Sequence, residues 1–202
     1  RTVTAAAHEV GALFVLDCIA SGTIWVDMAD TGVDVLISAP QKGWSGPPCC
    51  ALVALSERAR ERIDATTSSS FACDLKKWLQ IMETYEKGGH AYHATMPTDA
   101  LTRLRDVMLE SQAIGFERLR EAQYALGQQV RALLESRGMS SVAAPGFQAP
   151  GVVVSYTDDP EIQNSRKFLG QGLQTAAGVP LQCDEPEGFS SFRIGLFGLE
   201  KL

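Results

Sequence analysis

The order of apolar and polar stretches predicts strands and helices that follow one another through the first half of the chain. Three continuous apolar runs predict buried strands, over 12–17, 33–38 and 51–55. Residues 1–10 are expected to be the end of a helix that stops at Gly11. Ser56 is a typical N-cap for a helix that continues to about Ile63. Because buried strands alternate with helices, we expect an α/β sheet covered on both faces.

The remaining pattern predicts further helices and then a change of architecture. Segment 64–74 is polar and expected to be a loop, followed by a short helix over 74–83. Pro97 precedes a helix with an apolar stripe, and a second helix is predicted to stop at Gly138. From about 139 the pattern indicates a small α+β domain, with strands at 152–155 and 192–194 and a helix near 160–171.

Composition narrows the classes of partner. The chain is 45% hydrophobic and 21% charged, which is ordinary for a folded globular protein. A formal net charge of −6 and a pI near 5.1 give no attraction to nucleic acid or to an anionic membrane. No apolar run is long enough to span a bilayer, and the first residues do not form a signal-peptide pattern. We therefore expect neither a nucleic-acid nor a membrane partner, and a cytoplasmic protein.

The cysteines and histidines do not follow the spacing of a disulfide scaffold or a zinc site. The chain has five cysteines and three histidines, and no Cys-x-x-Cys is present. We expect reduced thiols and no metal.

The candidate chemistry lies where two of the predicted strands end. The run 12–17 ends in Asp17, and the run 33–38 leads into a Gly/Pro-rich loop that carries Lys42. A lysine on such a loop is held rigidly and partly desolvated, as a catalytic amine requires. We expect the two strands to deliver the acid and the amine to the same edge of one sheet.

This ordered set, with Ser-x-x-Gln-Lys at 38–42 and Pro-Pro at 47–48, resembles the class V pyridoxal-phosphate aminotransferases, which include alanine–glyoxylate and serine–pyruvate aminotransferases. Tyr-His-Ala-Thr-Met-Pro at 92–97 and Phe-Arg-Ile-Gly at 192–195 continue the resemblance. It covers essentially the whole chain but only the later part of a family member. We therefore expect the 202 residues to belong to a longer polypeptide and to be inactive alone.

The resemblance implies a fold and a division of the chain. Residues 1–113 would be the second part of a fold-type-I large domain, with a mostly parallel sheet and flanking helices. Residues 114–138 would be a connecting helix, and 139–202 a small, incomplete α+β C-terminal domain.

The resemblance also assigns residues around pyridoxal 5'-phosphate. Lys42 would form the Schiff base and move the α-proton, and Asp17 would pair with the pyridine nitrogen. Ile19 would pack on the ring, and Gln41 would lie near the phosphate. Taken alone, Lys42 would be an ordinary surface lysine, Asp17 a turn cap and Ile19 a core residue.

Two further matches concern a second subunit and the substrate. Tyr92 and Thr95 match a pair of hydroxyls that reaches the phosphate of the neighbouring subunit, which implies a homodimer. Arg193 matches the arginine that binds the substrate carboxylate through its guanidinium fork. The implied reaction is transamination of a small amino acid, of alanine or serine type, with a 2-oxo acid such as glyoxylate or pyruvate.

Two alternatives remain open from the sequence. A cysteine desulfurase shares the fold and has a reactive cysteine late in the chain, where Cys183 lies, but its lysine usually follows His, not Gln. A catalytically inactive scaffold on the same fold is the other. One departure from the family is that Cys49-Cys50 follows Pro-Pro where glycine is usual.

Overall fold

The computed structural model describes residues 1–202, and their contacts divide the chain into two compact units. The first unit contains Arg1–Cys18, Val26–Pro40 and Pro47–Arg103. The second contains Ile19–Trp25, Gln41–Gly46 and Leu104–Leu202. Two short segments from the first half of the chain, one of them the Lys42 loop, thus belong with its second half. The division at residues 113 and 138 expected from the family stays a prediction.

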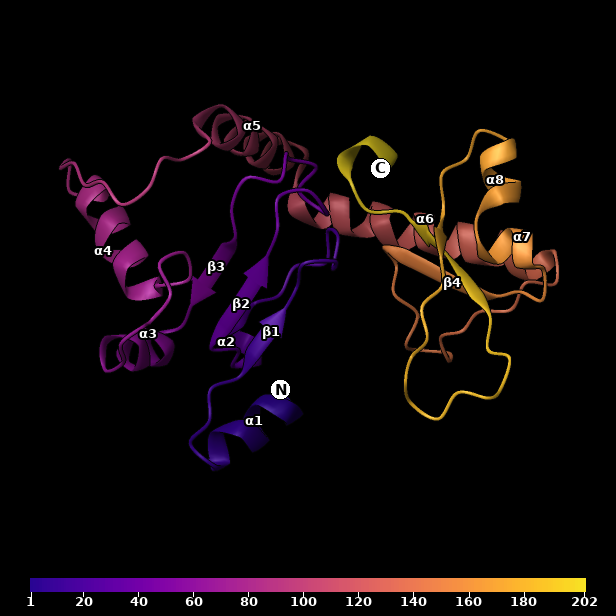
Figure 1. The fold of residues 1–202 in the computed structure, drawn as a ribbon, viewed down its shortest axis with the longest axis horizontal. Helices are drawn as coiled ribbons and strands as arrows, with labels where there is room; N and C mark the ends of the chain where they lie inside the picture. The colour runs from indigo at the N-terminus through magenta and orange to yellow at the C-terminus, as the bar shows by residue number, and fades with distance from the viewer. The chain divides into compact units, whose positions relative to one another are not determined.

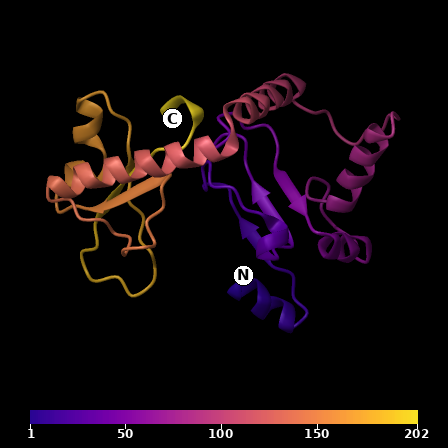
Figure 2. The ribbon, with the colours of Figure 1, turned by 180° about the vertical axis from the view of Figure 1, so that it is seen from behind.

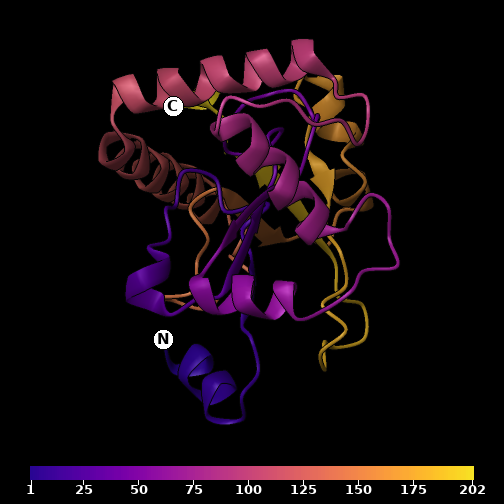
Figure 3. The same ribbon diagram turned by 90° about the vertical axis from the view of Figure 1, so that its left-hand side faces the viewer.

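The first unit contains a three-stranded sheet in the order β1-β2-β3 (Figure 1). Its elements are α1 (Thr2–Glu9), β1 (Val15–Asp17), α2 (Met28–Thr31), β2 (Val35–Ser38), β3 (Leu52–Leu55), α3 (Glu57–Asp64) and α4 (Leu75–Glu86). β1 and β2 run parallel, whereas β3 runs antiparallel to β2. Figure 3 shows α3 beside α4, and α3 also contacts β3.

Several local sequence signals are confirmed in this unit. α1 ends at Glu9, and Gly11, two residues later, adopts the left-handed conformation with φ 73°. Ser56 caps α3 by accepting a hydrogen bond from the Ala59 N–H. The expectation of fully buried strands on a sheet covered on both faces is wrong for this chain, because no residue of β1, β2 or β3 is fully buried and Val15 is 53% exposed.

A buried carboxylate, which the apolar pattern did not indicate, fixes the start of β2. Asp34 is 2% exposed and accepts hydrogen bonds from the Phe14 N–H at 2.8 Å and the Ser56 hydroxyl at 3.2 Å. His8 Nε2 lies 2.7 Å from Asp34 Oδ2, the same oxygen that accepts from the Phe14 N–H. These contacts join α1, β1, β2 and the N-terminus of α3. Asp34 therefore connects most of the first unit through one side chain.

The second unit contains a long helix packed on an antiparallel sheet. α5 (Thr98–Ile114) enters it from the first unit, and Gly115, with φ 99°, separates α5 from α6 (Phe116–Ser136). The other elements are β4 (Val152–Tyr156), α7 (Pro160–Gln163), α8 (Arg166–Gly170), β5 (Ala176–Ala177), β6 (Ser191–Gly195) and the 3₁₀ helix η1 (Leu199–Lys201). The strand order is β4-β6-β5. Figure 2 shows α6 running along β4, and the core is formed by Leu134, Val153, Phe192 and Leu196.

The small domain differs from its predicted pattern in two places. The helix expected near 160–171 is broken into α7 and α8, because Ser165 adopts the left-handed conformation with φ 70°. β5 was not predicted, since its two residues are too few to show a period. No helix of the structure combines the length and apolarity needed to cross a membrane.

Candidate functional site

Asp17 and the strand that precedes Lys42 end at the same edge of the first sheet. In the parallel pair, Asp17 is in register with Ile37, and the Cys18 N–H donates to the Ile37 carbonyl at 2.7 Å. The expectation that β1 and β2 deliver their carboxyl ends together is thereby confirmed. Asp17 is exposed, not buried as the sequence suggested.

Lys42 leaves that edge on a loop whose beginning is buried. Ala39 is 8% exposed and Pro40 is fully buried, whereas Gln41 is exposed. Lys42 itself is partly buried, and its Nζ lies 5.6 Å from the centroid of the Phe197 ring. This distance is within the range of a cation–π contact. The amine is thus held against an aromatic face next to β6.

The backbone on either side of Lys42 packs closely on the segment 19–25. A Cβ added at Gly43 would lie 2.3 Å from the carbonyl oxygen of Gly22. Gly22 has φ 69°, and a Cβ added to it would lie 3.0 Å from the Gln123 side chain and 3.1 Å from the Phe197 Cβ. Glycine is therefore required at position 43, because a Cβ there would push the Lys42 loop away from Gly22, and the positive φ of Gly22 favours glycine at that position as well.

An aromatic cluster anchors the same loop to the N-terminus of α6. The Trp25 ring lies 5.1 Å from that of Trp44 and 4.9 Å from that of Phe116. The Trp25 indole N–H also donates to the Phe116 carbonyl at 2.8 Å. The sequence analysis missed this cluster. The available signal was that Trp44 follows Lys42 by two positions on a loop that is otherwise small and polar.

Ser45 ties the loop to the C-terminal end of the chain. Its hydroxyl accepts a hydrogen bond from the Leu199 N–H at 2.6 Å and donates to the Glu200 carboxylate at 3.1 Å. The hydrogen bond from Lys201 is the main cause that lowers the pKa of Glu200, and the bond from Ser45 lowers it further. Ser45 has φ 58°, so its backbone is held in a conformation that L-residues seldom adopt.

Tyr92 and Thr95 present two hydroxyls at one point of the first unit. Their oxygens lie 3.1 Å apart, and both residues are exposed. His93 between them is anchored, with its ring 4.2 Å from Phe71 and 5.0 Å from Trp78 and its Nε2 3.1 Å from the Phe71 carbonyl oxygen. The loop is thus fixed by His93 and leaves the two hydroxyls directed to the same place.

Arg193 lies in β6, the central strand of the small sheet. It is in register with Val154 on one side and Ala176 on the other. Its Nε donates to the Ala177 carbonyl at 2.9 Å, and the residue is partly buried. No carboxylate pairs with it in the structure. Anchoring through Nε orients the guanidinium, so that its terminal nitrogens can bind an anion in a fork.

The predicted residues divide between the two units. Ile19, Gln41, Lys42 and Arg193 belong to the second unit, whereas Asp17, Tyr92 and Thr95 belong to the first. Ile19 is partly buried. Cys183, the candidate thiol of the alternative reading, is exposed in a turn where the Glu185 carboxylate accepts from its backbone N–H at 2.7 Å and from that of Gln182 at 2.8 Å. These two bonds lower the pKa of Glu185.

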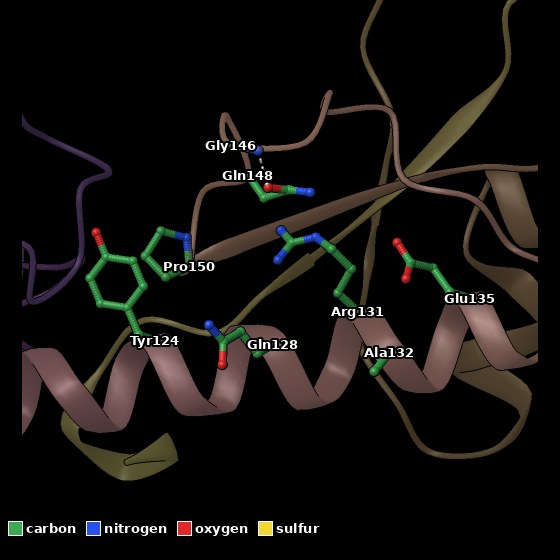
Figure 4. Close-up of a pocket in the computed structure, with 8 residues that line it drawn as sticks. All are labelled: Tyr124, Gln128, Arg131, Ala132, Glu135, Gly146, Gln148 and Pro150. Carbon is green, nitrogen blue, oxygen red and sulfur yellow. Dashed lines mark hydrogen bonds between the residues drawn. The ribbon is translucent and has the colours of Figure 1, made fainter.

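A separate groove of about 450 Å³ lies between α6 and the loop before β4 (Figure 4). Arg131 crosses it and donates to the Ala149 carbonyl at 3.0 Å and the Gly127 carbonyl at 3.5 Å. The loop is also closed by Gln148, whose side chain accepts from the Gly146 N–H at 2.8 Å. None of the predicted site residues lines this groove, and Arg131 holds the loop onto α6.

Two curated proteins are similar to this chain over almost its whole length. The soluble hydrogenase small subunit of Synechococcus sp. (strain PCC 6716) is 28% identical over 189 residues, which are 93% of this chain and 47% of that protein. The alanine–glyoxylate aminotransferase of Oryctolagus cuniculus is 28% identical over 200 residues, or 95% of this chain and 49% of that protein. The chain thus spans about half the length of these curated relatives.

A solved structure and a family profile extend the comparison. The crystal structure of alanine–glyoxylate aminotransferase from Nostoc sp. superposes with a TM-score of 0.82 at 20% identity, covering 99% of this chain and 52% of that one. This likeness confirms the fold class, the later part of a fold-type-I large domain with a small α+β domain. The profile described as Aminotransferase class-V matches residues 1–183. The chain belongs to the class V aminotransferase family.

Proposed function

We propose that this protein transfers an amino group from a small amino acid, of alanine or serine type, to a 2-oxo acid such as glyoxylate or pyruvate, with pyridoxal 5'-phosphate as cofactor. The observation that carries the proposal is the placement of Lys42, a partly buried amine facing an aromatic ring on a loop fixed at three neighbouring residues. A surface lysine without a role would not need such fixation. Family membership and the relative named for alanine and glyoxylate support the reaction class.

The side chains available on the chain fit the chemical groups of this cofactor. An aldehyde needs an amine, which Lys42 offers. A dianionic phosphate needs hydrogen-bond donors, and the two hydroxyls of Tyr92 and Thr95 lie 3.1 Å apart. A protonated pyridine nitrogen is matched by a carboxylate, which Asp17 offers, and an aromatic ring by an aliphatic side chain such as Ile19. Gln41 is proposed as a further neighbour of the phosphate.

When bound, pyridoxal phosphate supplies an electron sink for the α-carbon of an amino acid. The chain's own residues then have three tasks. Lys42 takes the proton from the α-carbon and returns it at the end of the transfer. Arg193 binds the α-carboxylate, oriented by the bond from its Nε to Ala177. Asp17, as a carboxylate, keeps a proton on the nitrogen that it binds.

The hydroxyl pair also supports a proposal about assembly. Tyr92 is 71% exposed, which is unusual for a large aromatic residue whose ring and hydroxyl have no partner beyond Thr95. We infer that the pair binds the phosphate held by a second copy, so that the working protein is a homodimer. Molar mass measured by light scattering tests this, and a monomer that is fully active would contradict it.

Borohydride reduction of the purified complete polypeptide with pyridoxal phosphate tests the function. We expect one cofactor fixed to the peptide that contains Lys42, and pyruvate formed from alanine with glyoxylate. Lys42→Ala should lose both, whereas Lys87→Ala, an exposed lysine at the end of α4, should lose neither. Cofactor still fixed to the Lys42→Ala variant at full yield would contradict the assignment. Sulfide release from cysteine that depends on Cys183 would instead favour the desulfurase.

A further inference from the structure

The chain that follows β6 is packed on the Lys42 loop. β6 ends at Gly195. The carbonyl of the next residue, Leu196, accepts a hydrogen bond from the Gln123 amide at 3.2 Å. Gln123 is fully buried and also donates to the Pro150 carbonyl at 3.3 Å. The start of this segment, Leu196–Lys201, is therefore fixed to α6 and to the residues just before β4.

Beyond Leu196 the segment makes two different contacts with the loop. The Phe197 ring lies under the Lys42 ammonium at 5.6 Å from Nζ, and the Phe197 Cβ is close to Gly22. The Ser45 hydroxyl then makes two hydrogen bonds to the segment, one accepted from the Leu199 N–H and one donated to the Glu200 carboxylate. The segment therefore contacts the Lys42 amine directly and also binds Ser45, three residues after Lys42.

We propose that the segment Leu196–Lys201 positions the Lys42 amine, with Phe197 and Ser45 as the positioning residues. The inference rests on the proposed function, since it deepens the role given to Lys42. Arg193 lies four residues before Phe197 in the same stretch of chain, and β6 continues directly into the segment. The strand that would bind the substrate carboxylate therefore also sets the place of the amine that moves the α-proton.

The physical reason is that proton transfer from carbon depends on the distance and direction of the amine. A displacement of about 1 Å can cost on the order of a hundredfold in rate. An aromatic face attracts an ammonium group but cannot take its proton. A carboxylate at the same place would form a stronger ion pair and would hold the amine in its charged form. Phe197 can therefore hold Lys42 without removing it from the reaction.

Two substitutions at position 197 separate the ring face from simple packing. Phe197→Leu keeps an apolar side chain but removes the ring, and Phe197→Tyr keeps the ring. In the active protein we expect Phe197→Leu to lower kcat on the order of tenfold with KM changed by less than about twofold, and Phe197→Tyr to retain most of kcat. Phe147→Leu, at a ring that is 82% exposed, is the matched control and should change neither constant.

A second measurement does not depend on catalysis. Cofactor-free protein is treated with an amine acylating reagent at fixed pH, and the labelling rate of Lys42 is followed by peptide mass spectrometry. Loss of the ring contact should raise the rate about two- to fivefold in Phe197→Leu, and Ser45→Ala should raise it as well. Lys87 provides the internal reference rate.

The outcomes are distinguishable. If wild-type protein labels slowly at Lys42 and Phe197→Leu labels faster, but neither transaminates, the proposed function fails while the restraint on Lys42 stands. If Phe197→Leu is folded by circular dichroism and labels at the wild-type rate, the positioning role is overturned. An equal fall of kcat in the leucine and tyrosine variants would also overturn it, because the ring face would then have no part.

A second inference rests on the adjacent thiols Cys49 and Cys50, which the proposed function does not use. Their sulfur atoms lie 3.8 Å apart, and both residues are partly buried and free of disulfide bonds. Burial, with the neighbouring Cys49 thiol, raises the pKa of Cys50 to about 11, so the pair is poorly suited to attack as a thiolate. Neighbouring thiols on the same side of the chain can still chelate one soft atom.

We propose that Cys49 and Cys50 form a binding site for thiophilic trivalent arsenicals. With phenylarsine oxide, two sulfur–arsenic bonds form, both thiol protons leave with the oxygen as water, and no oxidation occurs. The sulfur separation is close to that needed for two sulfurs on one arsenic. Single thiols, such as the exposed Cys73 and Cys183, can form only one such bond.

Intact-mass spectrometry with phenylarsine oxide tests this second site. We expect one phenylarsenic group per chain, loss of two titratable thiols, and an adduct that survives excess monothiol but is removed by a dithiol. Cys49→Ser or Cys50→Ser should weaken binding by about a hundredfold or more, because the second bond is lost. Cys73→Ser is the control and should bind as wild type. Equal binding by the Cys50→Ser variant, or no adduct on wild type, would overturn the proposal.

Discussion

His8 Nε2 lies 2.7 Å from Oδ2 of Asp34, a carboxylate whose side chain is 3% exposed. This pair fixes α1 to the beginning of β2. Burial raises the pKa of Asp34, but the hydrogen bonds from the Phe14 N–H, His8 and Ser56 outweigh it, so the pKa lies below its usual value. The folded state therefore stabilises the ionised form of Asp34.

Asp34→Asn is expected to lower the free energy of unfolding by about 1–3 kcal/mol. The neutral amide loses the negative charge that strengthens the bonds from the Phe14 N–H and His8 to Oδ2, and its NH₂ group takes the place of Oδ1, so the Ser56 hydroxyl loses its acceptor. Urea denaturation followed by circular dichroism measures the loss. Asp30→Asn, which removes an exposed ion pair with Arg1, is the control and should have a much smaller effect. Equal stability of Asp34→Asn and wild type would contradict this account.

The same carboxylate predicts how stability depends on pH. An unfolded aspartate has a pKa of about 4, and that of folded Asp34 is lower. Its contribution is therefore fully present above the unfolded pKa and is lost as the pH falls through the folded pKa. Unfolding measured between pH 7 and pH 3 should show a constant difference between wild type and Asp34→Asn above about pH 5, and a shrinking one below pH 4. A difference that stays constant down to pH 3 would argue against the assignment.

Local signals of the sequence predicted the elements, but not the contacts that hold the candidate site. The stop at Gly11, the cap at Ser56 and the strand that leads to Lys42 were all readable, because each depends on neighbouring residues. Ser45 and Leu199 meet across 154 positions, and no periodicity records such a contact. Asp34 was hidden for a related reason, since its partners come from three separate elements.

The burial of the first sheet could not be predicted from the sequence, for a different reason. The apolar runs predicted strands that are covered on both faces, yet Val15 is 53% exposed and Asp17 is exposed. An apolar run shows that a strand is suited to burial, but not which part of a protein covers it. The assignment of Asp17 to the pyridine nitrogen therefore rests on the family and stays a prediction.

Gly43→Ala is expected to displace the Lys42 loop and to destabilise the second unit by about 1–3 kcal/mol. The added Cβ would lie 2.3 Å from the Gly22 carbonyl oxygen and 2.6 Å from its carbon, and backbone cannot move aside as a flexible side chain can. Gly170→Ala is the control, since no atom lies within 4 Å of its Cβ and it ends α8. Thermal unfolding measures both. A melting temperature for Gly43→Ala that matches that of Gly170→Ala would show that the two glycines are not in close contact.

Arg193→Lys is expected to weaken binding of the amino acid far more than binding of the cofactor. Lysine keeps the positive charge but loses the fork, and it also loses the Nε that donates to Ala177 at 2.9 Å and orients the group. The loss in substrate binding should be about 1–3 kcal/mol, the range for a hydrogen bond to a charged group. Spectral titration of the cofactor-loaded protein with alanine measures it. Arg166→Lys, at an exposed position in α8, should bind alanine as wild type does. Unchanged affinity of Arg193→Lys for alanine, with cofactor bound normally, would exclude Arg193 as the carboxylate-binding residue.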